Sequence, residues 1–421
     1  MHFENFRQYG ANIGRHLWIF LKWCLVSIGI GFGVGCIGAL FAICMDLATK
    51  TREQNDFLLY FLPFAGLVIV FLYRITHSDH DRGTNQVLAT IHAESELPVK
   101  MAPLIFVSTI LTHLFGGSSG REGAALQIGG SIGNQVGRLL RFDDNDRRVA
   151  TMCAMSAAFS AVFGTPVAAA FFSMEVVSVG IMYYAALVPC VFSSLIAHFC
   201  AQLFSVPHTS LSILSVPDFS FFSFSMITLL AVLCAVLSIL FCLALDGGNR
   251  LFRKFLTNPY IRIFTGGVLI IALTLLCGSR DYLGAGMEQI ATAVGGQAVP
   301  FAFLLKILFT VITISCGFKG GEIVPSFFIG ATFGCSFGLL FGFSPSLCAA
   351  VGMISVFCGV TNCPVSSLLI AAELFGFSSV FYFLPAIAVS YMLSGYYGLY
   401  HDQTIVYSKF KTKFINKKAG E

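Results

Sequence analysis

Apolar segments follow one another along this chain almost without interruption, which leaves few folds open to it. The long ones are near or above the roughly 20 residues that a helix needs to cross a bilayer. They are 17–44, 57–75, 183–206, 221–245, 260–277 and 300–316. Only 11% of the residues are charged, against about 25% in ordinary soluble domains. Soluble enzymes, nucleic-acid-binding proteins and disordered regulators are therefore excluded, and a lipid bilayer is the predicted surroundings.

Shorter apolar segments, many of them interrupted by glycine, lie between the long ones, at 83–92, 123–140, 150–163, 166–179, 334–343 and 364–377. Many are too short to cross a bilayer as straight helices. Broken helices at membrane depth are tolerated only where they are buried in protein or line a cavity. The sequence therefore predicts an all-α, polytopic membrane protein of the transporter or channel type, rather than a receptor or an anchor.

The chain contains an internal repeat. Five residues recur 201 positions later: Gly116, Gly120, Ile128, Gly129 and Gly133 match Gly317, Gly321, Ile329, Gly330 and Gly334. Pro166 and Glu175 recur as Pro364 and Glu373 at an offset of 198. Such paired repeats are typical of inverted-repeat transporters, whose substrate site lies between the repeats. We predict two halves, 1–206 and 219–421, joined by a linker at 207–218, with no soluble regulatory domain.

Basic residues are frequent near both ends of the chain. They are Arg7, Arg15 and Lys22 at the start, and Lys409, Lys411, Lys413, Lys417 and Lys418 at the end. By the positive-inside rule, both termini are predicted to be cytoplasmic, in a cell inner membrane. The net charge of +4 is small and gives no reason to expect a nucleic-acid partner. No cofactor is predicted, and no His, Cys or Asp cluster has the spacing of a metal site.

The segment 116–123, Gly-Gly-Ser-Ser-Gly-Arg-Glu-Gly, leads the chain into the start of an apolar helix. Free backbone N–H groups and the positive end of the helix dipole attract an anion at such a place. Glu122 puts a carboxylate there. This carboxylate can occupy the anion site itself and can leave it when protonated. Glu122 is therefore the predicted gate and proton carrier, and the alternative is a helix-terminal acid paired with Arg121.

Two further turns are candidates for anion binding. The repeat supplies a second Gly-rich turn, in which the backbone of Ile323 and Val324 is predicted to face the anion. A third turn opens a short apolar helix, where Thr84 and Asn85 offer a hydroxyl and an amide N–H group.

Three more glutamates lie in or beside apolar helices, where ionisable residues are costly and often functional. Glu175 and Glu373 occupy corresponding positions of the repeat, which indicates a shared structural task such as capping, with a coupling role left open. Glu322 is predicted to be structural. Because it is the counterpart of Arg121 at the offset of 201, we expect these two residues to share a buried polar network.

A remote alternative is an intramembrane serine protease. The tetrapeptide 117–120 matches the GxSG pattern of such enzymes, with Ser119 as the nucleophile and His198 or His208 as the base. The pattern is only four residues long, and its counterpart in the repeat has no serine. The charged residues Arg121 and Glu122, which directly follow the pattern, are also better suited to ion transport than to proteolysis.

Four motifs, in order, resemble those of the CLC family of chloride channels and transporters. Gly120-Arg-Glu-Gly123 resembles GREGP, Gly321-Glu-Ile-Val-Pro325 resembles GIFAP, Gly83-Thr-Asn-Gln-Val87 lies where the family has GSGIP, and Thr404-Ile-Val-Tyr407 lies where its last helix presents a pore-facing tyrosine. The resemblance implies an inverted repeat of many tilted helices and a homodimer with one anion pathway per subunit. It adds Gly120, Arg121, Gly123 and Tyr407 to the predicted anion site.

The details are similar to the fluoride/proton antiporter branch of that family. Asn85 matches the asparagine of its first turn, and 320–325 matches its GGE-x-x-P turn. The inner glutamate of chloride/proton exchangers falls on Val176 here. The chain departs from the branch at Thr84, Ala124 and Val324, where the branch has Asn, Thr and Thr. The resemblance implies a secondary transporter that exports fluoride in exchange for protons, and a chloride/proton exchanger or passive chloride channel of the same fold is the alternative.

Overall fold

The computed structural model describes residues 2–78, 81–92, 97–207 and 211–420, and within these ranges it has sixteen α-helices. Eight lie before the non-helical stretch that follows Leu203: α1 (His2–Gln54), α2 (Leu62–Ile75), α3 (Thr84–Ile91), α4 (Met101–Leu114), α5 (Glu122–Leu139), α6 (Asp144–Phe163), α7 (Pro166–Glu175) and α8 (Leu187–Leu203). Eight follow it: α9 (Phe221–Phe255), α10 (Pro259–Cys277), α11 (Met287–Val294), α12 (Ala302–Cys316), α13 (Ile323–Phe341), α14 (Pro345–Thr361), α15 (Pro364–Phe375) and α16 (Val380–Leu393).

Six helical segments of the described chain are long and apolar enough to cross a bilayer: Asn12–Gln54, Asp56–Ile75, Tyr184–Leu203, Phe221–Phe255, Pro259–Cys277 and Ile323–Phe341. Five coincide with predicted long segments. The sixth predicted segment, 300–316, forms the shorter helix α12. The predicted short segment 334–343 instead belongs largely to the long helix α13. The multi-pass membrane class is confirmed.

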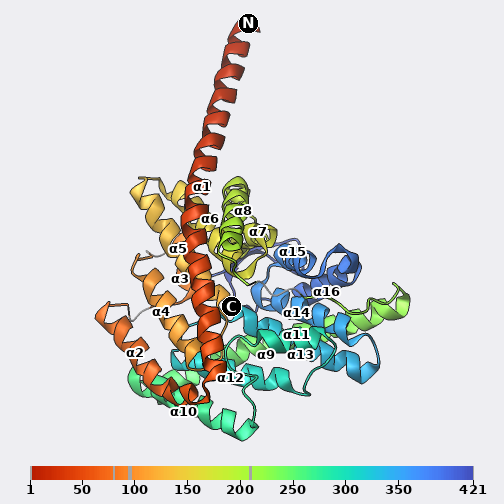
Figure 1. Cartoon of the computed structure of the whole chain (residues 1–421). Coiled ribbons are helices and arrows are strands. Elements are labelled where there is room, and N and C mark those ends of the chain that lie inside the picture. Colours follow the sequence, from red (N-terminus) through yellow and green to blue (C-terminus); the bar gives the residue numbers. More distant parts are fainter. Residues whose placement is uncertain (1, 79–80, 93–96, 208–210, 421) are drawn as a thin grey trace.

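The first helix is much longer than a membrane is thick. Its 53 residues span about 80 Å at 1.5 Å per residue. α1 runs along the helical body and continues beyond it to the N-terminus (Figure 1). The other helices pack into one body, in which most of α13 is buried.

Glycines allow the same close helix packing in both halves. A Cβ atom on Gly129 of α5 would lie 2.4 Å from the carbonyl oxygen of Ala154 on α6. A Cβ atom on Gly330 of α13 would lie 2.3 Å from the carbonyl oxygen of Gly352 on α14. The two pairs correspond at the repeat offsets of 201 and 198. Small residues thus bring corresponding helices into contact, as is common in membrane bundles.

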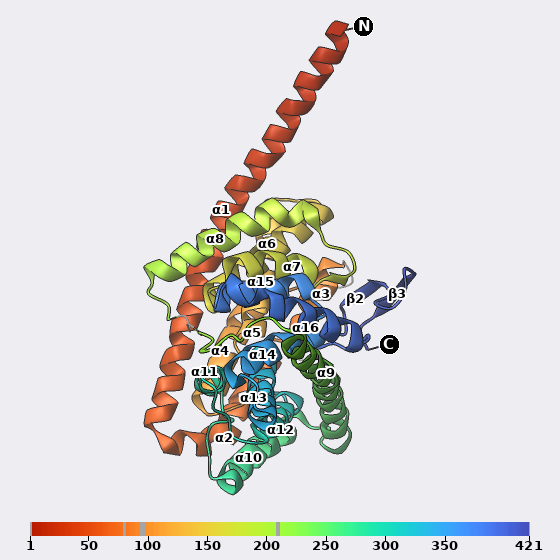
Figure 2. The same ribbon diagram turned by 90° about the vertical axis from the view of Figure 1, so that its right-hand side faces the viewer.

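Two short helices, α7 and α15, cap each other. The Glu175 carboxylate at the end of α7 accepts hydrogen bonds from the first N–H groups of α15, and the Glu373 carboxylate does the same for α7. The donors are Val365 (3.0 Å) and Ser366 (2.8 Å) for Glu175, and Val167 (2.9 Å) and Ala168 (2.8 Å) for Glu373. Every member of one set lies 198 residues from its counterpart, which is the reciprocity expected of a two-fold relation between the halves. This is the capping contact that the repeat indicated for the two glutamates. Figure 2 shows the two helices side by side.

Neutralising either capping glutamate should destabilise the protein. We expect Glu175→Gln and Glu373→Gln each to lower the free energy of unfolding by about 1–2 kcal/mol, because a carboxylate binds helix-start N–H groups more strongly than an amide does. Denaturant unfolding of the purified protein in detergent measures the change. Glu288→Gln is the matched control, because Glu288 is exposed in the first turn of α11. Capping variants as stable as this control would contradict the assignment.

The end of the chain forms a small sheet beside the helices. Its strands are β1 (Ser178–Val179), β2 (Thr404–Tyr407) and β3 (Phe414–Lys418), with β1 parallel to β2 and β2 antiparallel to β3. β2 and β3 project from one side of the body (Figure 2). The sequence predicted a last helix at 404–407, and this expectation is wrong because backbone pairing to β1 and β3 holds the segment as a strand.

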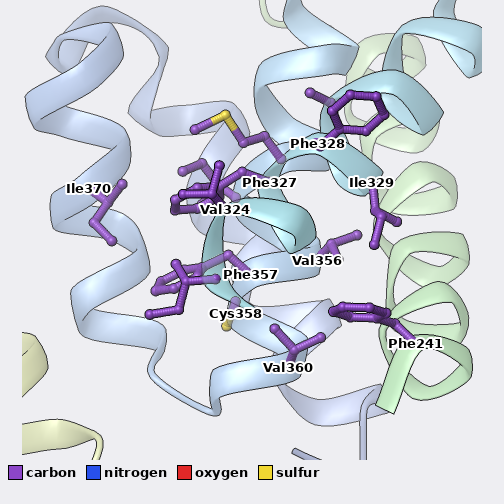
Figure 3. Close-up of a cluster of buried hydrophobic side chains, with 14 of the residues drawn as sticks. Phe241, Val324, Phe327, Phe328, Ile329, Val356, Phe357, Cys358, Val360 and Ile370 are labelled. Carbon is purple, nitrogen blue, oxygen red and sulfur yellow. The ribbon is translucent and has the colours of Figure 1, made fainter. Parts of the chain in front are cut away.

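An apolar cluster surrounds the start of α13. Phe327 of α13 lies against Phe357 of α14, with ring centroids 4.9 Å apart. Figure 3 shows these rings with Val324, between Ile370 of α15 on one side and Phe241 of α9 on the other. Tight packing in such an interior leaves little freedom for side chains. The cluster therefore holds the first turn of α13 in place inside the protein.

Candidate functional site

The starts of α5 and α13 meet inside the protein, where the two halves of the chain face each other. The Gly120 N–H group donates a hydrogen bond to the Gly321 carbonyl oxygen (2.6 Å), and the Gly321 N–H group donates to the Gly120 carbonyl oxygen (2.8 Å). A Cβ atom on Gly123 would lie 2.9 Å from the Gly321 Cα atom, so the approach requires glycine. Two helix starts are thus fixed next to each other, each with backbone N–H groups that lack intrahelical partners.

Glu122 is buried at the start of α5, with 1% of its surface exposed. Its side chain folds back over the turn, where one carboxylate oxygen accepts a hydrogen bond from the Arg121 N–H group (3.1 Å). The other lies 3.6 Å from the Arg121 Nε atom. The same carboxylate flanks Gly120, since a Cβ atom there would lie 3.1 Å from Glu122 Oε2 and 3.2 Å from Pro325 Cδ. The carboxylate therefore lies beside both helix starts, where a small anion would be attracted.

The third helix start, at α3, is tied to the first. The Thr84 hydroxyl donates to the Gly123 carbonyl oxygen at 3.4 Å. The Gln127 amide donates to the same carbonyl oxygen (3.2 Å) and to the Thr84 hydroxyl oxygen (3.4 Å). Thr84 is therefore engaged in positioning α3 against α5. The sequence did not predict a role for Gln127 in this contact between α3 and α5. No feature of its apolar segment distinguishes it from an ordinary buried glutamine.

Asn85, the next residue of α3, faces the chain near its C-terminus. Its side-chain oxygen accepts a hydrogen bond from the Asp402 N–H group at 3.1 Å. Within the described residues its amide N–H groups have no hydrogen-bond partner. They are the donors that the sequence predicted Asn85 to offer to an anion.

Tyr400 is a functional candidate that the sequence analysis missed. The residue is 1% exposed, and its hydroxyl is buried without a hydrogen-bond partner in the described structure. Burial raises the pKa of the Tyr400 hydroxyl well above its usual value. A buried hydroxyl normally has a partner, so this one is available to a bound ion or water. In the sequence, Tyr400 is marked only by its place two positions after Gly398. Other tyrosines nearby also lie within two positions of a glycine, so this feature does not single it out.

Tyr407 does not join these residues. Its side chain is 47% exposed, and its ring lies 5.9 Å from the ring of Phe414 on β3. A Cβ atom on Gly180 would lie 3.2 Å from the Tyr407 Cβ atom, which places the residue against the end of β1. The prediction that it faces the anion path from a helix is wrong, because the residue is the last one of strand β2, in the exposed hairpin that β2 forms with β3.

The buried polar network expected between Arg121 and Glu322 is not formed: within the described residues, no ion pair or hydrogen bond joins their side chains. Arg121 pairs with its neighbour Glu122 instead. Glu322 lies at the start of α13, and one of its carboxylate oxygens would be 3.9 Å from a Cβ atom on Gly123. The two backbone hydrogen bonds between Gly120 and Gly321 join the turns in place of the expected side-chain network.

The serine of the protease pattern is packed inside the protein. Ser119 Oγ lies 3.3 Å from His113 Nε2, and both residues are buried. A Cβ atom on Gly320 would lie 2.1 Å from Ser119 Oγ, so a peptide has no room there. No ion pair of the described residues joins His113 to a carboxylate that could orient it. Of the two predicted bases, His198 lies on α8, and His208 lies outside the described residues.

The fold and this site together define a class: a multi-pass membrane protein whose interior helix starts suit a small anion. Residues 65–395 match the model of the voltage gated chloride channel family, and the chain belongs to this family. A chloride/fluoride channel protein of Pseudomonas syringae pv. tomato is 34% identical to the chain over 395 residues, which are 92% of this chain and 87% of that protein.

Two solved structures share the fold. A CLC-type fluoride/proton antiporter superposes with a TM-score of 0.87 at 31% identity, covering 91% of this chain and 98% of that one. A slow cyanobacterial Cl⁻/H⁺ antiporter superposes with a TM-score of 0.76 at 20% identity, covering 89% and 94%. At that identity the second likeness concerns the fold alone.

Proposed function

We propose that this protein is a secondary transporter that exports fluoride in exchange for protons. The observation that carries the proposal is the Glu122 carboxylate, buried beside two helix starts that come from opposite halves of the chain. A carboxylate is the side chain that both resembles a small anion and carries a proton. The names of the similar chloride/fluoride channel protein and of the fluoride/proton antiporter support fluoride as the anion.

The exchange follows from competition for one place. Ionised Glu122 occupies the helix starts and excludes fluoride. When Glu122 takes up a proton, its attraction to the N–H groups weakens, and fluoride replaces it. Departure of the proton toward the other side lets the carboxylate return and expel the ion. Inward protons thereby drive fluoride out of the cell.

The proposed fluoride ligands are neutral donors. They are the backbone N–H groups near Gly120, Gly123, Ile323 and Val324, the Asn85 amide and the Tyr400 hydroxyl. Neutral donors hold an anion without a full positive charge in its path, which would bind it too tightly for turnover. Thr84 and Arg121 act from beside the site, Thr84 on the position of α3 and Arg121 on the Glu122 carboxylate.

The second candidate function is chloride/proton exchange or passive chloride flux. Val324 favours it, because this residue supplies no hydroxyl at the start of α13, where the fluoride/proton branch has threonine. Proteoliposomes separate the two functions. We expect a fluoride gradient to drive proton movement against a proton gradient, and an equal chloride gradient to drive much less. Chloride flux without proton movement would overturn the antiporter proposal.

Tyr400 should bind the transported anion. We expect Tyr400→Phe to raise the KM for fluoride by roughly fivefold to tenfold, which corresponds to one hydrogen bond of about 1–1.4 kcal/mol. Tyr407→Phe removes a hydroxyl from the exposed hairpin and is the matched control. Initial rates of fluoride efflux measured with a fluoride electrode give both values. Equal KM values for the two variants would remove Tyr400 from the site.

The assembly and the membrane placement are also part of the proposal. We assign two repeat halves at 1–206 and 219–421, a homodimer with one pathway per subunit, and an inner-membrane location with both termini in the cytoplasm. The basic residues at the two ends support the orientation. Glu175 and Glu373 serve as caps rather than as proton carriers, because each carboxylate binds two N–H groups at the start of the facing helix.

A further inference from the structure

An ion pair ties the start of α3 to the turn before α13. Lys319 Nζ lies 2.7 Å from Asp81 Oδ2, although the two residues are 238 positions apart. The Asp81 side chain is 2% exposed and that of Lys319 is 22% exposed. The other Asp81 oxygen accepts a hydrogen bond from the N–H group of Gly83 (2.9 Å), the residue that caps α3. The pair therefore acts directly on the turn that presents Asn85.

Lys319 is held from two further directions. Its ammonium group lies 4.2 Å from the centre of the Tyr73 ring. Its backbone N–H group donates to the Thr112 hydroxyl at 3.2 Å. In the described structure its one ion-pair partner is Asp81, so neither Glu122 nor Glu322 pairs with its charge. These contacts hold the Lys319 ammonium group beside the proposed site, where it does not form an ion pair with Glu122 or Glu322.

The pair carries no net charge, yet each member lies two residues from a glycine of an anion-binding turn. Lys319 precedes Gly321 by two positions, and Asp81 precedes Gly83 by two positions. Loss of one partner would leave a full charge of known sign next to the anion path. In partly buried surroundings, a unit charge on the order of 10 Å away changes anion binding roughly tenfold.

We propose that Asp81 and Lys319 are positioning residues that lock the α3 turn to the α13 turn and keep the anion path electrically neutral. This inference rests on the proposed transport function and extends it to a pair outside the family motifs. According to this inference, removal of the Asp81 charge and removal of the Lys319 charge change anion affinity in opposite directions. Breaking a purely structural ion pair would not produce opposite changes.

The test compares the full-length protein with four variants in proteoliposomes, using fluoride and chloride as the probes. Asp81→Asn leaves an unopposed cation, so the anion KM should fall roughly tenfold, with a lower kcat because release slows. Lys319→Met leaves an unopposed carboxylate, so KM should rise roughly tenfold. The double variant D81N/K319M is neutral again, and its KM should return to within about twofold of the original value. Lys319→Arg keeps the charge and should keep KM.

The matched control is Lys22→Met, which breaks the ion pair of Lys22 with Asp146 between α1 and the start of α6. It should leave both KM values unchanged. KM shifts of the same sign in the two single variants, or a double variant as impaired as the worse single one, would overturn the inference. If the single variants fail to fold, the neutral double variant must still fold and keep KM, and its failure would also overturn it.

The readout separates this inference from the transport proposal. A protein that carries chloride without protons would refute fluoride/proton exchange, and the opposite shifts of chloride KM would still establish the pair. A protein that exchanges fluoride for protons, with no opposite shifts, would uphold the transport proposal and refute the pair. Loss of all halide transport in the unmodified protein would refute both.

Discussion

Replacing Glu122 with glutamine should reduce proton transport to the background of protein-free liposomes while fluoride still crosses the membrane. The amide keeps the size of the carboxylate but can neither release nor take up a proton. It is also a weaker partner for helix-start N–H groups than a carboxylate is. The site is then open to the anion at all times, and the exchange becomes an uncoupled leak. Proton uptake, followed with a pH-sensitive dye under an imposed fluoride gradient, measures the loss.

A buried glutamate elsewhere in the protein is the control for this result. Glu175→Gln changes the same chemical group, but Glu175 caps α15 and lies outside the proposed anion path. It should keep the proton-to-fluoride ratio of the unmodified protein, although it is less stable. If Glu122→Gln still moved protons against their gradient, the proton carrier would be another residue.

The second large effect is expected at the contact between the two helix starts. A Cβ atom on Gly321 would lie 2.6 Å from the Gly123 nitrogen and 3.0 Å from its Cα atom, both of them backbone. Gly321→Ala must therefore push the two turns apart and break the paired hydrogen bonds with Gly120. We expect the free energy of unfolding to fall by about 1–3 kcal/mol. Fluoride flux should fall by at least tenfold, because the N–H groups of the two helices would no longer converge.

A glycine with free space around it is the control. A Cβ atom on Gly33 of α1 would meet nothing within 4 Å. Gly33→Ala should therefore keep full fluoride flux and equal or greater stability, since alanine favours a helix interior. Unfolding in detergent and fluoride efflux from liposomes report on both variants. A Gly321→Ala protein with normal flux would show that the contact between the helix starts is dispensable.

Hydropathy and internal repetition were enough to predict the architecture. Apolar segments of membrane-spanning length follow from composition alone, because a bilayer requires about 20 apolar residues per helix. The pairs Gly129/Gly330 and Glu175/Glu373 were visible as offsets in the sequence. The structure explains them, because each pair makes the same contact in both halves. Glu122 was proposed for a local reason, since a Gly-rich turn and a helix start predict an anion site without knowledge of the fold.

The choice among similar residues depended on tertiary packing. Tyr396, Tyr397, Tyr400 and Tyr407 are alike in the sequence, and the one whose buried hydroxyl lacks a partner in the described structure was not the one predicted. The strand at 404–407 was missed because its partners, β1 and β3, are set by long-range pairing.

By itself, then, the sequence determined the membrane class and the two-fold repetition and led us to propose Glu122 as the gate, because these depend on composition and on local chain direction. Only the tertiary structure decided that Arg121 pairs with Glu122, that Tyr400 points into the interior, and that Lys319 meets Asp81. Each of these contacts depends on where side chains meet when helices pack. Hydropathy predicts the helices of the fold, but it does not predict which polar side chains will meet when the helices pack.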